Sequence, residues 1–184
     1  YSSIDGFASD WHLVHLGQYA HGRAGTIIQE ATAISPEGRI TYADAGLWSD
    51  DHIAGWKKVV DYVHSQGSKI GIQLAHAGRK ASTNKPWINR LQFAPEHELG
   101  WQTISSTDKG FHPKDAPPTA MTTAEVKAMV QTFKQAAERA IQAGYDILEI
   151  HAAHGYLIHQ FYSPLINDRT DEYGGSFENR IKFL

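Results

Sequence analysis

The sequence lacks cysteine altogether, and it has little that would commit it to a membrane or a nucleic acid. With no cysteine among 184 residues, the chain has no disulfide framework and no thiolate metal site. No apolar run is long enough to span a bilayer, and no signal peptide is visible. The formal net charge of -3 and the lack of a basic cluster argue against a nucleic-acid surface. These absences favour a cytoplasmic protein with neither membrane nor nucleic acid as partner.

What the chain does contain is an ordinary globular composition, with 41% hydrophobic and 20% charged residues. A chain of 184 residues is long enough for one domain with a substantial core. It opens at Tyr1 without a methionine and stops at Leu184 inside a helical pattern. We therefore interpret residues 1–184 as one domain that is incomplete at both ends, the N-terminal-half fragment of a longer protein.

Helical and strand-like patterns alternate along the sequence. Helices are expected over residues 10–21, 50–66, 123–143 (after a capping box at 122–125) and from 176 onward, and strands over 26–34, 69–78 and 145–151. Each strand follows a helix, which predicts an α/β fold with a parallel sheet. Three strands cannot close an eight-stranded barrel, so a partial TIM barrel and a doubly wound sheet both stay open on periodicity alone.

Two of these segments carry patterns that predict which way their side chains face. In the first helix, we expect Trp11, Val14 and Tyr19 to form the buried side. In the strand over residues 69–78, large Ile and Leu side chains alternate with Gly, Gln and Ala. The larger face suits packing against helices, and the smaller face suits a crowded barrel interior.

The stretch Tyr145–Ile166 concentrates the residues that could carry chemistry. His151, His154 and Tyr156 follow a strand within six residues, at the strand end where active sites of parallel α/β folds lie. Two imidazoles could donate hydrogen bonds to a substrate oxygen that gains negative charge. A phenol, whose reference pKa is about 10, is protonated at neutral pH and can act as an acid.

Other interpretations of the same residues stay open on these grounds. His151 and His154 could join His159 as metal ligands in a hydrolase, although the sequence has neither an HExxH pattern nor a cysteine ligand. The histidines could also be structural residues of the core, and Tyr156 a buried tyrosine whose hydroxyl finds a partner. A third interpretation is a non-catalytic half-barrel that serves in assembly.

A few residues at strand ends could contact a cofactor. Gln73 lies on the smaller face of its strand, and its carboxamide offers a donor and an acceptor that match the imide edge of a flavin ring. The small side chain of Ala31 would let its backbone N–H approach a flat ring closely. Arg79 and Lys80 could be phosphate contacts or solvated charges. Each signal is weak alone, since a strand glutamine is more often a structural hydrogen bonder.

Four longer motifs carry a family resemblance: IIQEATAISPEGRIT, GLWSDDHI, GSKIGIQLAHAGRKAS and EIHAAHGYLIHQFYSPLINDRTDEYGGSFENR. Together they resemble the Old Yellow Enzyme family of flavin-dependent ene-reductases, in its NADPH dehydrogenase branch. The resemblance runs through nearly the whole chain and is weakest over residues 87–118. It implies a TIM barrel that holds FMN non-covalently at its C-terminal face, with Ala31 and Gln73 as flavin contacts and NADPH as reductant.

The resemblance also implies a reaction and its residues. The substrate would be a small α,β-unsaturated carbonyl compound, with hydride passing from flavin N5 to the β-carbon of its C=C bond. His151 and His154 would hold the carbonyl oxygen, Tyr156 would donate the proton, and Tyr1 would line the substrate pocket. No metal is implied. Members of the branch assemble as dimers or tetramers, so the resemblance is compatible with a homo-oligomer.

Overall fold

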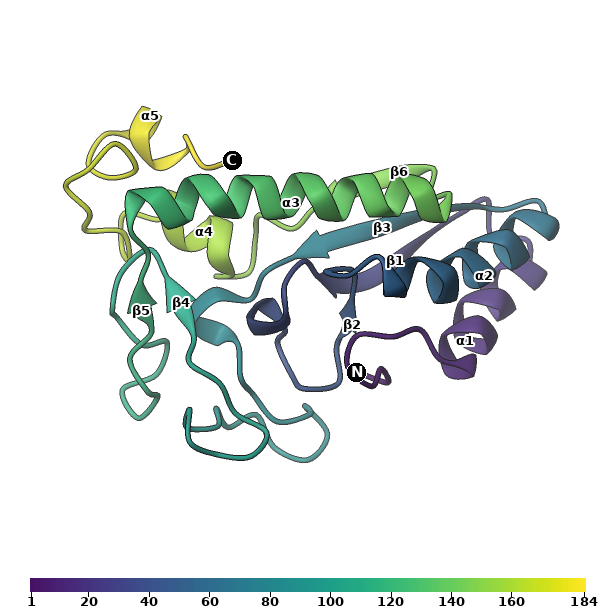
Figure 1. Ribbon diagram of the computed structural model, residues 1–184, viewed down its shortest axis with the longest axis horizontal. Helices are drawn as coiled ribbons and strands as arrows, with labels where there is room; N and C mark the ends of the chain where they lie inside the picture. The colour runs from purple at the N-terminus through teal and green to yellow at the C-terminus, as the bar shows by residue number, and fades with distance from the viewer.

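The computed structural model describes residues 1–184, and its central feature is a four-stranded parallel sheet in the order β2-β1-β3-β6 (Figure 1). Its strands are β1 (Thr26–Ala33), β2 (Ala45–Gly46), β3 (Lys69–Ala75) and β6 (Ile147–Ile150). The sheet confirms the predicted α/β architecture. The pattern of the sequence did not predict β2, because two residues are too few to show a period.

Three helices cover one face of this sheet (Figure 1): α1 (Asp10–His21), α2 (Asp51–Ser65) and α3 (Thr123–Ala143). α2 lies between the other two and contacts both. The strands β1, β3 and β6 are neighbours in chain order, with their helices on the same side. A doubly wound sheet reverses its strand order and carries helices on both faces, so this arrangement is that of a barrel wall.

The remaining elements are short. Two helices follow β6, and two single turns follow β1 and β3: α4 (Leu157–Tyr162), α5 (Phe177–Arg180), η1 (Pro36–Gly38) and η2 (Gly78–Lys80). The segment over residues 81–118 extends away from the sheet (Figure 1). Within and beside it, β4 (Ile104–Ser105) and β5 (Thr119–Ala120) pair in parallel as a separate small sheet.

The prediction for the buried side of the first helix is wrong. The three residues expected there are 47%, 70% and 48% exposed: Trp11, Val14 and Tyr19. The stripe that α1 turns toward the core contains His12, Leu16 and Ala20. His12 hides the helical period because a polar residue occupies a core position, where its ring packs edge-on against Trp56 with the centroids 5.0 Å apart.

Local signals do fix the ends of α3. Thr122 Oγ1 accepts a hydrogen bond from the N–H of Glu125 at 3.2 Å, and the carboxylate of Glu125 accepts one from the N–H of Thr122 at 2.7 Å. This is the predicted capping box. Gly144 follows the last turn at φ 94°, a left-handed conformation that glycine adopts without a Cβ clash.

The two faces of the sheet differ in chemistry. On the face toward the helices, the side chains of β3 are completely buried: Ile70, Ile72 and Leu74. The opposite face, which we call the open face, has layers of residues paired in register across β1, β3 and β6: Ile28, Gly71 and Ile147, then Ala31, Gln73 and Glu149. Side chains on the inward face of the strands fill the interior of TIM barrels. The smaller face of β3 is therefore the open face, as predicted.

The strand β6 is an edge of the sheet. All its residues, Ile147–Ile150, are exposed, and no strand pairs with its far side. An eight-stranded barrel needs further strands at such an edge.

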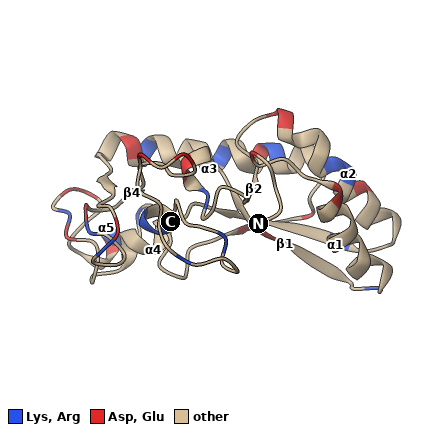
Figure 2. Ribbon diagram, turned by 90° about the horizontal axis from the view of Figure 1, so that it is seen from below, with Lys and Arg blue, Asp and Glu red and all other residues tan.

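Charged residues of both signs are interspersed along the ribbon (Figure 2). None of the helices combines the length and the apolar character that crossing a membrane requires.

Candidate active site

A tight turn after β6 brings three predicted residues together. The N–H of His151 donates to the carbonyl oxygen of Leu74 at 2.9 Å, so His151 continues the strand, and alternation places its side chain on the open face. The chain then passes through His154 and Gly155 in left-handed conformations, with φ of 57° and 74°. Tyr156 is the residue that caps α4. Two successive left-handed residues turn the strand into the helix within a few positions.

The rings of these residues gather around His151. Its centroid lies 5.1 Å from that of His154, with the planes at 78°, and 4.8 Å from that of Tyr156, with the planes at 74°. Both are edge-to-face arrangements. His151 is buried, Tyr156 is half-buried and His154 is exposed. One ring is therefore fixed by packing, while the other two reach toward solvent beside it.

His151 is arranged as a neutral hydrogen-bond donor. Its Nδ1 accepts a hydrogen bond from the N–H of Ala153 at 3.3 Å. In the neutral ring this leaves the proton on Nε2. Burial lowers the pKa of His151, and the neighbouring His154 lowers it further. At neutral pH the ring is uncharged and has one N–H to donate.

Tyr156 is arranged to keep its proton. Burial raises the pKa of Tyr156 to about 12, with Tyr1 and Asp44 adding to the shift. Asp44 is buried, and its carboxylate accepts hydrogen bonds from the N–H of Ile40 at 2.6 Å and from the hydroxyl of Thr41 at 2.8 Å. Burial raises the pKa of Asp44 to about 6, so the group is mostly ionised at pH 7. Its negative charge disfavours a phenolate nearby.

Ala31 and Gln73 lie side by side on the open face, one layer before His151. They are register partners, and Gln73 is in turn the partner of Glu149. The Gln73 Nε2 donates to the Glu149 Oε1 at 2.7 Å, which leaves the carboxamide oxygen of Gln73 as the acceptor that a ligand N–H could meet. A bulge between Gln29 and Ala31 shifts the register of β1 at this level. Bulges are common next to active sites, where they change the direction of a side chain.

Tyr1 lies at the rim of the same region. Its ring meets that of Trp87 edge-on, with the centroids 5.9 Å apart, and Tyr1 contributes to the raised pKa of Tyr156. Trp87 belongs to the long segment after β3, for which the sequence shows no periodicity. That segment therefore reaches the site.

His159 does not join the histidine pair. Its Nδ1 accepts a hydrogen bond from the N–H of Gly155 at 2.8 Å, and its ring stacks on Tyr162 with the centroids 4.6 Å apart. The structure contains no group of three or more His, Asp or Glu side chains that could hold a metal ion. The hydrolase interpretation therefore has no third ligand.

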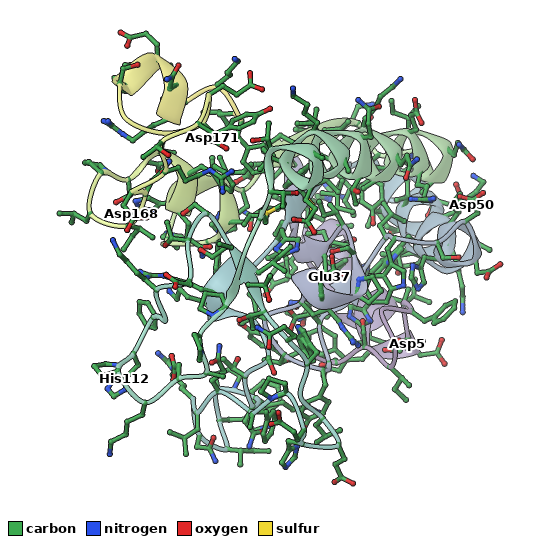
Figure 3. The ribbon with its side chains drawn as sticks, turned by 60° about the vertical axis from the view of Figure 1, so that its left-hand side comes forward. Asp5, Glu37, Asp50, His112, Asp168 and Asp171 are labelled. Carbon is green, nitrogen blue, oxygen red and sulfur yellow. The ribbon has the colours of Figure 1, made fainter.

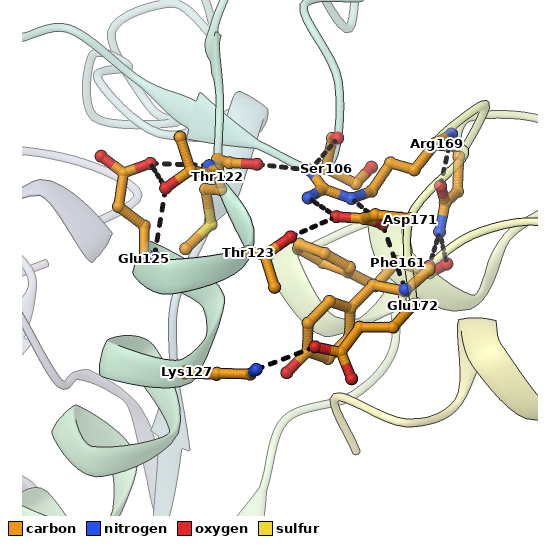
Figure 4. A network of polar contacts seen from close by, with 12 residues as sticks. Ser106, Thr122, Thr123, Glu125, Lys127, Phe161, Arg169, Asp171 and Glu172 are labelled. Carbon is orange, nitrogen blue, oxygen red and sulfur yellow. Dashed lines mark hydrogen bonds and ion pairs between the residues drawn. The ribbon is translucent and has the colours of Figure 1, made fainter.

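An arginine network ties the loop after α4 to the start of α3 (Figure 4). Arg169 donates to the carbonyl oxygens of Ser106, at 3.0 Å, and Met121, and its Nε donates to Asp171 Oδ1 at 3.0 Å. The hydroxyl of Thr123 donates to the same carboxylate at 2.7 Å. Charge-assisted pairs of this geometry are strong, so the network fixes the loop.

An open cavity of about 390 Å³ lies beside this network, and neither histidine of the pair lines it. Its lining includes Asp168 and Asp171, which Figure 3 shows on the opposite side of the view from Asp50, the residue before α2. The cavity is separate from the cluster of His151, His154 and Tyr156.

Comparison with known proteins gives relatives over the whole chain. The chain is 51% identical over 180 residues to the NADPH dehydrogenase of Bacillus subtilis (strain 168), covering 98% of this chain and 48% of that protein. It is 48% identical over 190 residues to an NADH:flavin oxidoreductase of Gibberella zeae, covering 100% of this chain and 45% of that protein. The chain thus spans about half the length of these relatives.

Solved structures show the same half-coverage. Morphinone reductase superposes with a TM-score of 0.85 at 34% identity, over 99% of this chain and 49% of its own. Old Yellow Enzyme from Pichia sp. AKU4542 gives a TM-score of 0.85 at 34% identity, over 99% of this chain and 47% of its own. The likeness confirms the predicted fold class, a partial TIM barrel, and the resemblance to Old Yellow Enzyme. Residues 2–184 match the family described as NADH:flavin oxidoreductase / NADH oxidase, and the chain belongs to that family of oxidoreductases.

Proposed function

We propose that the protein containing this chain is an FMN- and NADPH-dependent ene-reductase that reduces the C=C bond of small α,β-unsaturated carbonyl compounds. The observation that carries the proposal is the cluster of His151, His154 and Tyr156 at the carboxyl end of β6. Substrates of parallel barrels bind at that end. The relatives support a nicotinamide cofactor as reductant, since one is an NADPH dehydrogenase and one solved structure is morphinone reductase in complex with tetrahydroNAD.

The residues at this end fit a flavin ring. Ala31 presents little bulk, and the carboxamide oxygen of Gln73 beside it is an acceptor of the kind that an imide N–H requires. These two residues would hold the imide edge of FMN, next to the layer that contains His151. Bound there, FMN would supply the hydride for the substrate.

The histidine pair would orient the substrate. The Nε2–H of neutral His151 and the ring of His154, 5.1 Å away, can both donate to one carbonyl oxygen. That oxygen gains negative charge as the alkene is reduced, so both hydrogen bonds strengthen along the reaction. Interactions that strengthen in this way lower the barrier rather than only tightening binding.

Tyr156 would complete the reaction as the acid. Its raised pKa, about 12, keeps the proton in place until the α-carbon becomes basic enough to accept it. A positioned general acid contributes rate by removing that unstable charge as it forms.

The absorption spectrum of the full-length protein tests the proposal. A yellow protein that is bleached anaerobically by NADPH and recoloured by cyclohexenone would support it. A colourless protein that takes up no FMN on reconstitution would overturn it. Stoichiometric zinc with hydrolase activity that a chelator abolishes would favour the metal-dependent alternative.

A further inference from the structure

The single turn η2, directly after β3, lies against the turn that carries the candidate catalytic residues. Its last residue, Lys80, is 74 positions from His154 in the sequence, so no local pattern links the two. The sequence permits a phosphate contact or a solvated charge for Lys80. In the structure, the ammonium group of Lys80 instead contacts other residues of the chain.

The ammonium group of Lys80 contacts both His154 and Tyr156, the two ends of the turn that follows β6. Lys80 Nζ donates to the backbone carbonyl oxygen of His154 at 2.9 Å. The same atom lies 5.0 Å from the centre of the Tyr156 ring and 4.6 Å from the centre of the Phe111 ring. Cations at these distances are attracted to the faces of aromatic rings. Lys80 therefore holds the backbone of one candidate residue and the side chain of another.

The backbone of this turn needs contacts from other parts of the chain to hold its conformation. His154 is in the left-handed region at φ 57°, a backbone conformation that residues other than glycine rarely adopt. Such a conformation persists only where surrounding contacts hold it. A hydrogen bond to the carbonyl oxygen of the strained residue is a contact of that kind.

A second side chain holds the same turn from within the core. Gln160 is buried, and its Nε2 donates to the carbonyl oxygens of Gly155 at 2.7 Å and Ala77 at 3.2 Å. Its Oε1 accepts from the hydroxyl of Ser105 at 2.8 Å. A Cβ on Gly78 would lie 2.2 Å from this Oε1. Gln160 is thus part of the packed fold, whereas Lys80 is half-buried and can be changed without opening the core.

We propose that Lys80 is a positioning residue that aims the His154 ring and the Tyr156 phenol at one substrate. It transfers no proton itself. This inference rests on the proposed function, because it assigns Lys80 to the substrate-reducing step.

Four substitutions in the flavin-loaded full-length protein separate positioning from folding. Lys80→Met should lower kcat for cyclohexenone reduction by about tenfold or more, since small misplacements of reacting groups are costly, with unchanged flavin content and thermal midpoint. Lys80→Arg, which keeps the charge and the donor, should restore most of the rate. Lys58→Met removes a cation paired only with the exposed Asp10 and should change nothing. Gln160→Leu, in contrast, should lower the thermal midpoint.

A spectroscopic measurement independent of turnover completes the test. In protein labelled with 3-fluorotyrosine, the ¹⁹F resonance of Tyr156 is identified by its loss in Tyr156→Phe. Lys80→Met should shift this resonance, and Lys58→Met should leave it in place. An unmoved resonance, or a kcat within twofold of wild type, would overturn the role of Lys80. If the wild type reduces no enone, the proposed function fails, while the resonance still reports whether Lys80 holds Tyr156.

Discussion

The imidazole of His151 and the phenol of Tyr156 meet edge to face, with their ring centroids 4.8 Å apart. His151 continues β6 and Tyr156 caps α4, so the turn between them sets this distance. Burial lowers the pKa of His151 and raises that of Tyr156 to about 12. At neutral pH the imidazole is therefore uncharged and the phenol keeps its proton. A reaction that needs one neutral donor and one acid finds both in adjacent rings.

Removing the exposed histidine of the pair should slow the chemistry with little effect on the fold. For His154→Ala we expect kcat for enone reduction to fall about 100-fold, the usual effect of losing one donor to a developing oxyanion. Steady-state assays with cyclohexenone measure it. His21→Ala, at the exposed end of α1, is the matched control. A change below twofold in His154→Ala would contradict the assigned role.

The flavin contact predicted for Gln73 can be tested without turnover. Gln73→Met removes the carboxamide oxygen and should weaken FMN binding by about tenfold, the effect of losing one hydrogen bond of about 1.4 kcal/mol. Titration of the apoprotein with FMN, followed by flavin fluorescence, gives the affinity. Gln66→Met at the end of α2 should leave the affinity unchanged. Equal affinities for both variants would remove Gln73 from the site.

Stability should fall in mild acid, because three buried histidines resist protonation. Burial lowers the pKa of His12, His52 and His151 in the folded protein, whereas the unfolded chain takes up these protons near pH 6.5. Their contribution to the free energy of unfolding is therefore complete above about pH 6.5 and is lost as the pH falls below that value. Urea unfolding at pH 7.5, 6 and 5 measures the loss.

Asp44 should oppose this trend. Its folded pKa of about 6 lies above the unfolded value of about 3.9, so its contribution is complete below the unfolded pKa and is lost as the pH rises through about 6. Asp44→Asn should therefore make the decline between pH 7.5 and pH 5 steeper than in the wild type. A decline that is the same or shallower in the variant would contradict the burial of this carboxyl.

The amino ends of the strands hold an ionic cluster that should serve stability alone. The carboxylate of Asp146 lies 2.7 Å from Lys69 Nζ and 2.7 Å from His64 Nε2, and it accepts the N–H of Ile70 at 3.0 Å. The hydrogen bond from Lys69 is the main cause that holds the pKa of Asp146 far below its usual range. Asp146→Asn should cost about 1 kcal/mol in urea unfolding, a value reduced for partial exposure, with kcat unchanged. A loss of kcat at unchanged stability would refute this assignment.

How much of the fold and of the site the sequence predicts depends on whether each feature is set by residues close together in the sequence or far apart. The ends of α3 could be predicted, because Thr122, Glu125 and Gly144 are local signals. The clustering of the catalytic candidates could be predicted too, because their strand position and spacing are local. The hydrogen bond from Lys80 to His154 and the effect of Asp44 on the pKa of Tyr156 could not, since each joins residues that are distant along the chain.

The buried face of α1 failed to follow the hydrophobic pattern for the same reason. His12 occupies a core position where the ring of Trp56, from the next helix, packs against it.

The central claim is that Tyr156 is the acid of the reaction. The most direct test measures the rates of the two halves of the catalytic cycle separately in Tyr156→Phe. Stopped-flow absorbance should show anaerobic reduction of the bound flavin by NADPH within twofold of the wild type. Reoxidation by cyclohexenone should be slower by about 100-fold or more, the contribution of a positioned acid. If reoxidation by the enone is as fast as in the wild type, Tyr156 is not the acid and the account of this site is wrong.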